Sequence, residues 1–382
     1  MVPYYIVFYV ALIVVYLWYR FFLRFIDDVK SKRTYPPIHE KVTVIIPVYN
    51  ENKTLLTKCI QSVVEADGKK EIIVIDDGSK NNSWQVIKEL KKKYPQIKII
   101  QFKKNRGKRE VQFTAFNIAT GKFIITVDSD TIIEKNALEE LIKPFNDEKI
   151  GATTGYVKAY NKDKNFLTKM INARYKNAFA FERRGLSTFG IVTCCSGVIS
   201  AYRRSVIQKV KHHYISQRFL GQTCTYGDDR HLTNLFIKKG HKIAYVHNAV
   251  AYTEVPTTIR EYIRQQLRWR KSFLRESFVI LPYALKNNFL LTLEIFFNLV
   301  IPFFALLARM LIIYLLLILP YLLIPVAISI ALIAVLRNLL LFFEEPSYAL
   351  YSIPFAFFYE AIIYWLYWIA LFTLWDARWG TR

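Results

Sequence analysis

Two apolar regions enclose a charged middle in this chain, and that segregation limits the folds it can adopt. Residues 1–19 carry no charge and are about as long as a helix that crosses a bilayer. From Asn288 onward the chain turns apolar again. Hydrophobic residues make up 53% of the chain although 22% of residues are charged, so the charges gather in a separate region. We therefore expect a membrane protein with one water-facing domain between its apolar ends.

The charges after the first apolar region predict its orientation. Arg20, Arg24 and Lys30 follow it, and cationic residues favour the cytoplasmic side of a membrane. We therefore expect an integral protein of the plasma membrane whose middle domain is cytoplasmic. A secretory signal peptide is not expected, because a basic start and a small-residue cleavage site are missing.

The chain is strongly basic, with 53 Lys and Arg against 30 Asp and Glu and a formal net charge of +23. This charge suits membrane lipid or an anionic substrate. We expect no nucleic acid partner, since the chain has no nucleic-acid-binding motif. The four cysteines, Cys59, Cys194, Cys195 and Cys224, have no CxxC spacing and are expected to be free thiols in a reducing compartment.

The middle region predicts an α/β fold with a mostly parallel, nucleotide-binding sheet, because short β-branched runs alternate with helical stretches. Ligands bind such sheets at the carboxyl ends of the strands. The expected strands are 41–48, 71–75, 97–102 and 123–127, and the expected helices are 52–66 and 83–94. After residue 288, two spans are expected, Leu290–Leu307 and Leu316–Leu336, and a third apolar stretch covers Tyr351–Leu374.

One tyrosine and three acidic residues follow the first two expected strands. Tyr49 and Glu51 come after the first, and Asp76 and Asp77 end the second. Carboxylates at these positions can accept hydrogen bonds from a uracil or a ribose. In the same DDGS motif, Gly78 permits a tight turn and Ser79 can cap the next helix. An ordinary turn with a helix cap explains DDGS equally well on its own.

Two further motifs suit a nucleoside diphosphate. Asp128 and Asp130, in a DSD motif after the fourth strand, are the oxygen ligands that Mg²⁺ or Mn²⁺ prefers. Lys108 and Arg109, in a basic loop before a helix, can bind the diphosphate itself. The alternatives are a solvated turn for the first motif and a solvated charge run for the second.

A GDD motif and a QQLRW motif supply the remaining candidates. Asp229 is the candidate base for a sugar transfer, with Asp228 shaping the site or the pKa of its neighbour. Gln265, Arg268 and Trp269 share one face of an expected helix over 258–277. There the Trp offers a flat surface to a sugar ring and the Arg a charge to the leaving diphosphate. An amphipathic helix lying on the membrane is the alternative.

DDGS, DSD, GDD and QQLRW, in this order, resemble the processive inverting glycosyltransferases that include the cellulose, chitin and hyaluronan synthases. The segments GKREVQFTAF, CCSGVISAYR and QQLRWRKSFLRE look most similar to hyaluronan synthases, as does the terminal WGTR. Rhizobial chitooligosaccharide synthases come next. Two departures are Val198, where hyaluronan synthases usually carry Pro, and Arg270, where they usually carry Ser.

The resemblance implies a GT-A-like, Rossmann-like catalytic domain with flanking transmembrane and interfacial helices. It implies that Asp76 and Asp77 contact the uridine, that Lys108 and Arg109 lie near the diphosphate, and that Asp128 and Asp130 serve a Mg²⁺ or Mn²⁺ ion. Asp229 would be the base. The other expected substrate contacts are Tyr49, Glu51, Cys195, Gln265, Arg268 and Trp269, with Trp379 and Arg382 closing over the donor.

The implied function is a processive polysaccharide synthase that takes sugars from UDP-GlcNAc and UDP-GlcA, forms β-linkages by inversion and exports the growing polysaccharide. The alternative is a chitin or chitooligosaccharide synthase that uses UDP-GlcNAc only. The sequence leaves the oligomeric state open. The expected parts are a transmembrane helix in 1–26, a catalytic domain in 41–257, interfacial helices in 258–287, membrane helices in 288–374 and a gating tail in 375–382.

The positions of the apolar stretches and of the C-terminal tail predict how the chain crosses the membrane. If the tail reaches a cytoplasmic nucleotide and the N-terminus lies outside, the region after the catalytic domain crosses the membrane an even number of times. We therefore expect 351–374 to lie at or partly within the inner leaflet, which Pro354 and Glu360 make tolerable. An epitope tag after Arg382 should be accessible only from the cytoplasm, and a tag accessible only from outside would contradict this topology.

Overall fold

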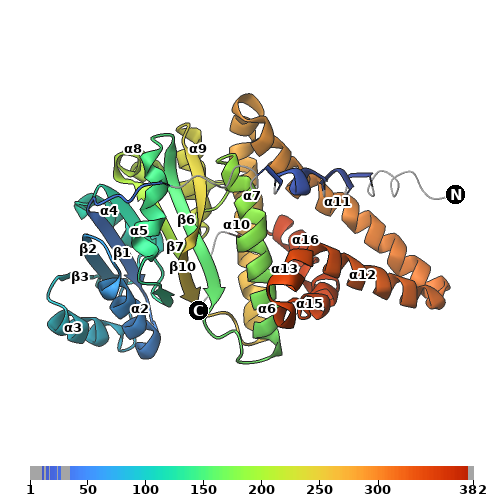
Figure 1. Ribbon diagram of the computed structural model, residues 1–382, viewed down its shortest axis with the longest axis horizontal. Coiled ribbons are helices and arrows are strands. Elements are labelled where there is room, and N and C mark those ends of the chain that lie inside the picture. The colour runs from blue at the N-terminus through green and yellow to red at the C-terminus, as the bar shows by residue number, and fades with distance from the viewer. Residues whose placement is uncertain (1–10, 13, 17, 24, 27–34, 377–382) are drawn as a thin grey trace. The chain divides into compact units, whose positions relative to one another are not determined.

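The computed structural model describes residues 11–12, 14–16, 18–23, 25–26 and 35–376. They fall into two compact units (Figure 1). The sheet unit comprises 35–161, 186–255 and 375–376, and the helical unit comprises the described residues between 11 and 26 together with 162–185 and 256–374. The chain passes from the helical to the sheet unit within α7 (Arg183–Thr188).

The sheet unit is built on an eight-stranded sheet in the order β3-β2-β1-β4-β7-β6-β10-β5. Neighbouring strands are parallel from β3 to β4, whereas β7 runs antiparallel to both β4 and β6. The strands are β1 (Val42–Val48), β2 (Lys70–Asp76), β3 (Ile97–Gln101), β4 (Phe123–Val127), β5 (Thr131–Ile133), β6 (Ile150–Ala159), β7 (Ile199–Arg203) and β10 (Lys242–Thr253). A separate short hairpin joins β8 (Arg218–Phe219) and β9 (Gln222–Thr223).

Helices cover both faces of this sheet. Val44, Ile46 and Val48 pack in one core with α2 (Lys53–Glu65), α3 (Ser83–Lys93) and α5 (Ala137–Ile142). Ile45 and Ile73 are also fully buried, and alternate residues of a strand face opposite sides of a sheet. The second face is therefore covered as well, and α4 (Lys108–Ile118), α8 (Arg204–Ile215) and α9 (Asp228–Lys238) pack there against the sheet and one another.

The first half of this fold confirms the predicted alternation of strands and helices. The four expected strands and two expected helices form with ends that differ by at most one residue from the prediction. Four of the seven pairings between neighbouring strands are parallel, as expected of a mostly parallel sheet, and β7 and β5 make it mixed because they run antiparallel to the strands beside them. Ser79 does not cap α3, whose N-cap is Asn82; its hydroxyl accepts the N–H of Asn50 instead.

Among the described residues, the helical unit contains two helices that are long and apolar enough to cross a membrane. They are α11 (Phe289–Ile318) and the stretch Pro320–Arg337, which includes α12 (Leu323–Arg337). The expected break within 308–315 is wrong, since α11 continues to Ile318 and the chain turns at Leu319. The interfacial segment forms one helix, α10 (Ile259–Asn287), although Pro282 lies within it.

The third apolar stretch does not form one continuous α-helix. It divides into α15 (Ser352–Phe358), a π-helical turn (Tyr359–Ile363) and α16 (Leu366–Leu371). Within the π-helical turn, Glu360 accepts two hydrogen bonds of 2.7 and 2.8 Å from the guanidinium of Arg309 on α11. This bidentate pair neutralises both charges and joins the third stretch to the first long helix.

The segment Lys162–Gly185 lies within the expected catalytic domain but packs with the C-terminal helices. It forms α6 (Phe166–Lys176) and a π-helix (Asn177–Glu182). Asn177 donates to Asn338 at 2.7 Å, and Lys176 forms an ion pair with Glu345. Polar contacts therefore fix this segment against the turn that follows α12.

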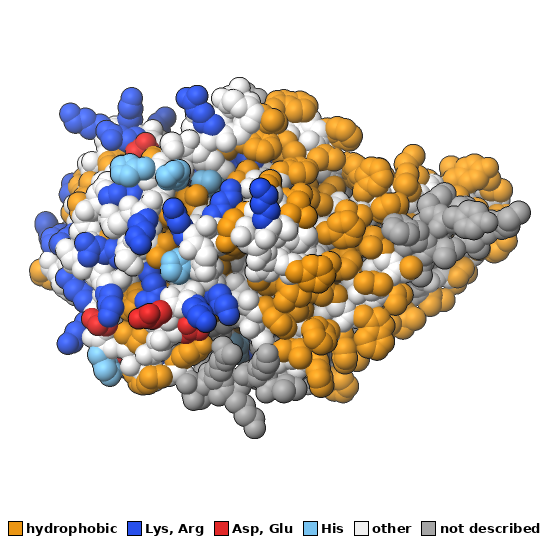
Figure 2. Space-filling view, turned by 90° about the horizontal axis from the view of Figure 1, so that it is seen from above, with side chains coloured by type: hydrophobic (Ala, Val, Ile, Leu, Met, Phe, Trp, Pro, Cys, Tyr) orange, Lys and Arg blue, Asp and Glu red, His pale blue; other side chains and the backbone are white. Residues whose placement is uncertain are grey.

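The two units expose different side chains (Figure 2). Lys and Arg side chains gather over the sheet unit, whereas hydrophobic side chains cover the helical unit. Exposed apolar residues of the helical unit include Leu317, Ile324 and Phe343, of which 78, 68 and 79% is exposed. Apolar patches of this kind mark surfaces that associate with a membrane or another protein.

Glu71 connects three strands at the start of β2. Its carboxylate accepts hydrogen bonds from the Thr43 hydroxyl on β1, from Lys98 on β3, and from the backbone and side chain of Thr120 before β4. Only 6% of Glu71 is exposed. Burial alone would raise the pKa of Glu71, but these hydrogen bonds lower it to about 2.

Glu71→Gln should lower the free energy of unfolding at neutral pH by about 1–3 kcal/mol, because charged hydrogen-bond partners lose their carboxylate. The folded pKa is depressed, so this contribution is present above the ordinary carboxyl pKa and is lost as the pH falls toward about 2. Thermal unfolding in detergent as a function of pH measures the difference. The exposed Glu65→Gln is the matched control, and equal destabilisation by both variants would contradict the prediction.

Candidate active site

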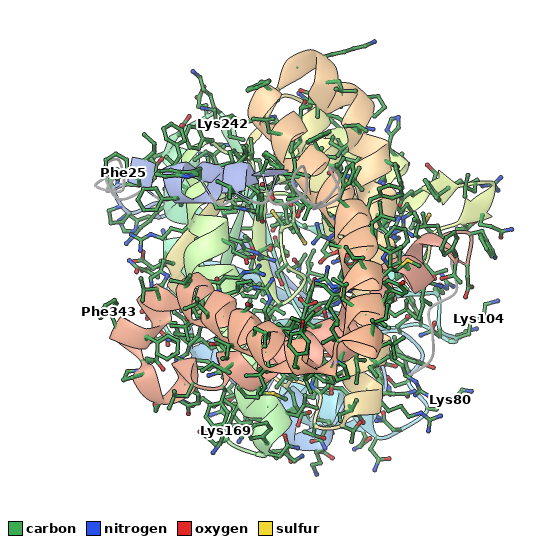
Figure 3. All side chains as sticks on the ribbon, turned by 90° about the vertical axis from the view of Figure 1, so that its right-hand side faces the viewer. Phe25, Lys80, Lys104, Lys169, Lys242 and Phe343 are labelled. Carbon is green, nitrogen blue, oxygen red and sulfur yellow. The ribbon has the colours of Figure 1, made fainter. Side chains whose placement is uncertain are left out.

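The loops after β1, β2 and β3 lie together at the carboxyl ends of the parallel strands. The backbone of Asn50 donates to the Ser79 hydroxyl at 2.9 Å, and the Lys80 backbone donates to the Asn50 side chain at 2.7 Å. Gly78 has a φ of 68°, and a Cβ on it would lie 2.5 Å from the backbone of Lys104. Only glycine fits so close an approach. Lys80 and Lys104 extend outward from these joined loops (Figure 3).

The two aspartates of DDGS have different surroundings. Asp77 accepts backbone N–H groups from Arg106 at 2.7 Å and Gly107 at 2.9 Å, so its carboxylate holds the basic loop before α4. Burial raises the pKa of Asp77, although these N–H donors oppose the rise. Asp76 is fully buried, and its Oδ1 has no hydrogen-bond partner among the described residues. An unsatisfied buried acceptor is costly, so this oxygen suits a ligand donor.

Lys108, the first residue of α4, joins two of the predicted acidic motifs. Its Nζ lies 2.6 Å from Asp128 Oδ1 and 3.5 Å from Asp228 Oδ2. Burial alone would lower the pKa of Lys108, but the two carboxylates raise it above its ordinary value. A permanently charged ammonium therefore lies between the DSD and GDD motifs, where it can contact an anionic ligand.

Arg109 lies beside Lys108 but is 6% exposed. Its guanidinium donates to the carbonyls of Tyr214 and Tyr226, each at 3.2 Å, and to Gln217 Oε1 at 2.6 Å. The side chain thus supports the turn that leads into GDD. A contact of Arg109 with the diphosphate stays a prediction.

Asp228 and Asp229 open α9 behind Gly227, whose φ is 74°. Burial works against ionisation of Asp228, but Lys108 and Arg109 lower its pKa below the usual range. The pKa of Asp229 is raised, first by burial and then by the charge of Asp228. The two adjacent carboxyls therefore differ in proton affinity. Such a difference is typical of active sites in which one group acts as an acid or a base.

The second aspartate of DSD completes the predicted metal pair. Asp130 Oδ1 lies 3.4 Å from the hydroxyls of Thr131 and Thr253, while Glu51 accepts the Ser129 hydroxyl at 2.7 Å. Among the described residues, no group of three or more His, Cys, Asp or Glu side chains is arranged to hold a metal ion. Two carboxylates nevertheless fit a Mg²⁺-type site whose remaining ligands are phosphate oxygens and water.

The segment Cys194–Gly197 passes beside both acidic motifs, and of its four residues only Cys195 is a predicted site residue. The Cys195 backbone donates to the Thr233 hydroxyl on α9 at 2.9 Å. A Cβ on Gly197 would lie 2.8 Å from Lys108 Nζ and 3.2 Å from Asp128 Oδ2. The SG pair inside CCSGVISAYR was the available signal, since a glycine next to such a motif often marks a close approach.

The remaining predicted residues come from three parts of the chain. Tyr49 is partly buried on the loop after β1. Gln265, Arg268 and Trp269 belong to α10 of the helical unit, where Trp269 is 41% exposed and its ring centroid lies 6.4 Å from that of Tyr175. Trp379 and Arg382 lie outside the described residues. The chain leads toward them from Asp376, whose carbonyl accepts the Tyr226 hydroxyl at 2.9 Å.

Gly197→Ala should displace the flexible end of Lys108 without unfolding the protein, because the added Cβ meets an ammonium rather than backbone. We expect the affinity for a nucleoside diphosphate to fall about tenfold, which corresponds to about 1.4 kcal/mol. Calorimetric titration with UDP measures this affinity, with thermal unfolding as the check on folding. Wild-type affinity in a folded variant would show that Lys108 does not contact the diphosphate.

Comparison with known proteins agrees with this geometry. Residues 43–211 match the family described as Glycosyl transferase family 2. The hyaluronan synthase of Streptococcus pyogenes is 40% identical over 286 residues, or 73% of this chain and 67% of that protein. An N-acetylglucosaminyltransferase of Neorhizobium galegae is 36% identical over 69% of this chain, and one of Bradyrhizobium diazoefficiens is 37% identical over 66%. The matches span 62% and 53% of these two relatives.

One solved structure resembles the whole fold. The mannosyltransferase PcManGT from Pyrobaculum calidifontis, in complex with GDP-Man and Mn²⁺, aligns with a TM-score of 0.67 at 18% identity. The alignment covers 97% of this chain and 99% of that protein. At this identity the likeness shows the fold, which is the expected GT-A-like one. The chain therefore belongs to glycosyltransferase family 2 and is a glycosyltransferase.

Proposed function

We propose that this glycosyltransferase is a processive, membrane-embedded polysaccharide synthase that uses UDP-GlcNAc and UDP-GlcA. The single observation that carries the proposal is the ammonium of Lys108 between Asp128 and Asp228, next in the chain to the partly buried Asp229. This arrangement offers a positive charge for a departing diphosphate next to a carboxyl that can take a proton. The similarity to a hyaluronan synthase supports the choice of donors.

The donor would bind across the carboxyl ends of the parallel strands. The unpaired Oδ1 of Asp76 would accept a hydrogen bond from the uridine, while Asp77 holds the loop that leads to Lys108. Asp128 and Asp130 would hold Mg²⁺ or Mn²⁺, and the Mn²⁺ in the mannosyltransferase complex supports a divalent ion. When bound, such an ion stabilises negative charge on the diphosphate.

The sugar transfer is then an in-line displacement that residues of this chain assist. The acceptor hydroxyl oxygen attacks the anomeric carbon of the sugar while the bond from that carbon to the diphosphate oxygen breaks. Asp229 takes the hydroxyl proton, and its raised pKa makes it a stronger base than an ordinary carboxylate. Lys108 stabilises the charge that develops on UDP, and Asp228 stays ionised beside it. An α-linked donor gives a β-linked product.

The helical unit would embed the enzyme in a membrane and accept the polymer. Its two long apolar helices and its exposed apolar surface support an integral membrane position. Gln265, Arg268 and Trp269 on α10 would serve the acceptor and the diphosphate, and Trp379 and Arg382 would close over the donor. In this proposal the sheet unit faces the cytoplasm and the polymer is exported.

A second candidate is a synthase that uses UDP-GlcNAc alone to make a chitin-like chain. The similarity to the two rhizobial N-acetylglucosaminyltransferases favours it. The two candidates share the same chemistry at Asp229 and differ only in the sugar that the site accepts.

Polymer synthesis by the purified protein in detergent tests the proposal. The enzyme receives Mg²⁺ or Mn²⁺ with UDP-GlcNAc alone, UDP-GlcA alone or both, and product length is measured by gel electrophoresis. Long polymer only with both donors is the expected result. Polymer from UDP-GlcNAc alone would establish the second candidate, and a single added sugar would contradict processive synthesis.

Asp229→Asn should reduce sugar transfer at least about 1,000-fold while leaving UDP affinity within about threefold, because removing the base affects the transition state and not donor binding. Single-turnover transfer and UDP titration measure the two effects. Asp67→Asn, a carboxylate distant from the site whose side chain is 44% exposed, is the control. Transfer at the wild-type rate in Asp229→Asn would refute the role of Asp229.

A further inference from the structure

The thiol of Cys194 lies directly against the proposed base. Its Sγ is 3.4 Å from Asp229 Oδ2, within hydrogen-bond distance for sulfur, and only 7% of Cys194 is exposed. The other oxygen, Oδ1, accepts the backbone N–H of Arg230 at 2.8 Å. The two oxygens of the carboxylate are therefore contacted from different elements, one by α9 itself and one by the loop before β7.

This loop is held rigidly where it meets α9. The Thr233 hydroxyl accepts the Cys195 N–H at 2.9 Å and donates to the Asp229 carbonyl at 2.7 Å. On the other side, the Ser196 backbone donates to the Thr154 hydroxyl on β6 at 3.1 Å. Cys194 thus approaches Asp229 from a backbone that is fixed to both the helix and the sheet, so the thiol position is determined by the fold.

The electrostatic surroundings of Asp229 contain both a like charge and cations. The charged or titratable groups that act on it are Asp228 and Arg230 on α9, Lys108 on α4, Tyr202 on β7 and Tyr214 on α8. Asp228 repels its charge, while Lys108 attracts it toward the diphosphate side of the site. The Arg230 N–H contacts Oδ1 and the Cys194 thiol lies beside Oδ2, so each oxygen of this carboxylate has a neighbour that can hold its orientation.

We propose that Cys194 is a positioning residue for Asp229, whose thiol donates a hydrogen bond to Oδ2 and fixes the carboxylate for proton abstraction. The inference rests on the proposed role of Asp229 as the base. A thiol is a weak donor. It therefore orients the carboxylate without withdrawing much of the basicity that the reaction requires, whereas a hydroxyl would bind more strongly and weaken the base.

Three substitutions of Cys194 separate the orientation of the Asp229 carboxylate from its basicity. Cys194→Ala removes the donor, Cys194→Val removes it at greater volume, and Cys194→Ser replaces it with a stronger donor. Cys224→Ala is the matched control, because Cys224 is also a buried thiol and its Sγ lies 4.0 Å from the Gln222 carbonyl oxygen. The measurements are kcat, KM and the pH profile of kcat/KM for sugar transfer, together with UDP affinity.

Loss of the donor should reduce kcat about tenfold in Cys194→Ala with little change in UDP affinity, since only the base is misaligned. The acid limb of kcat/KM should move up by about half a pH unit, because a hydrogen bond to the charged form lowers a carboxyl pKa. Cys194→Ser should keep kcat within about threefold of wild type and place the acid limb at or below that of wild type, since a hydroxyl is the stronger donor. If Cys194→Ala fails to fold, Cys194→Val and Cys194→Ser carry the same comparison.

The outcomes distinguish this inference from the proposed function. An inactive Asp229→Asn together with a shifted acid limb in the alanine or valine variant, and rescue by serine, supports both. An inactive Asp229→Asn with an unshifted acid limb in every Cys194 variant would overturn the positioning role alone. An active Asp229→Asn would overturn the assignment of the base, and the positioning role with it.

Discussion

The contact on which the site depends is the ammonium of Lys108 between the carboxylates of Asp128 and Asp228. Without that cation, two acidic motifs from distant parts of the sequence would repel each other in a partly buried space. The first turn of α4 delivers Lys108 to this position, and the loop before α4 is held by Asp77. Asp77 of the DDGS motif thus acts on the chemistry partly by placing Lys108, which lies 31 residues further along the chain.

The sequence allowed the strand ends and their acidic residues to be predicted, because β-branched runs and the turns after them are local signals. The packing of Lys162–Gly185 with the C-terminal helices could not be predicted, since it depends on contacts such as Asn177 with Asn338 that no periodicity encodes. Arg109 and Asp77 show the same limit. Their contacts with neighbouring backbone could not be predicted from residue type, while their predicted ligand contacts stay predictions.

Two uncharged residues, Gly197 and Thr233, help to position the charged groups of the site. Gly197 gives Lys108 and Asp128 the space for their ion pair, and Thr233 connects the loop of Cys195 to the first turn of α9. Neither carries a charge, yet each decides where a charged group lies. Such positions are recognised only when the backbone path is known, because their role is to leave space or to fix a loop.

The length of α11 has a consequence for the bilayer that would surround it. Its 30 residues correspond to about 45 Å of helix at 1.5 Å per residue, whereas the hydrocarbon core of a membrane is about 30 Å thick. A helix of this length matches such a core only if it leans well away from the membrane normal or extends into the headgroup region. If α11 spans a membrane, the chain would respond to bilayer thickness, and the bidentate contact of Arg309 with Glu360 would transmit that lean to the third apolar stretch.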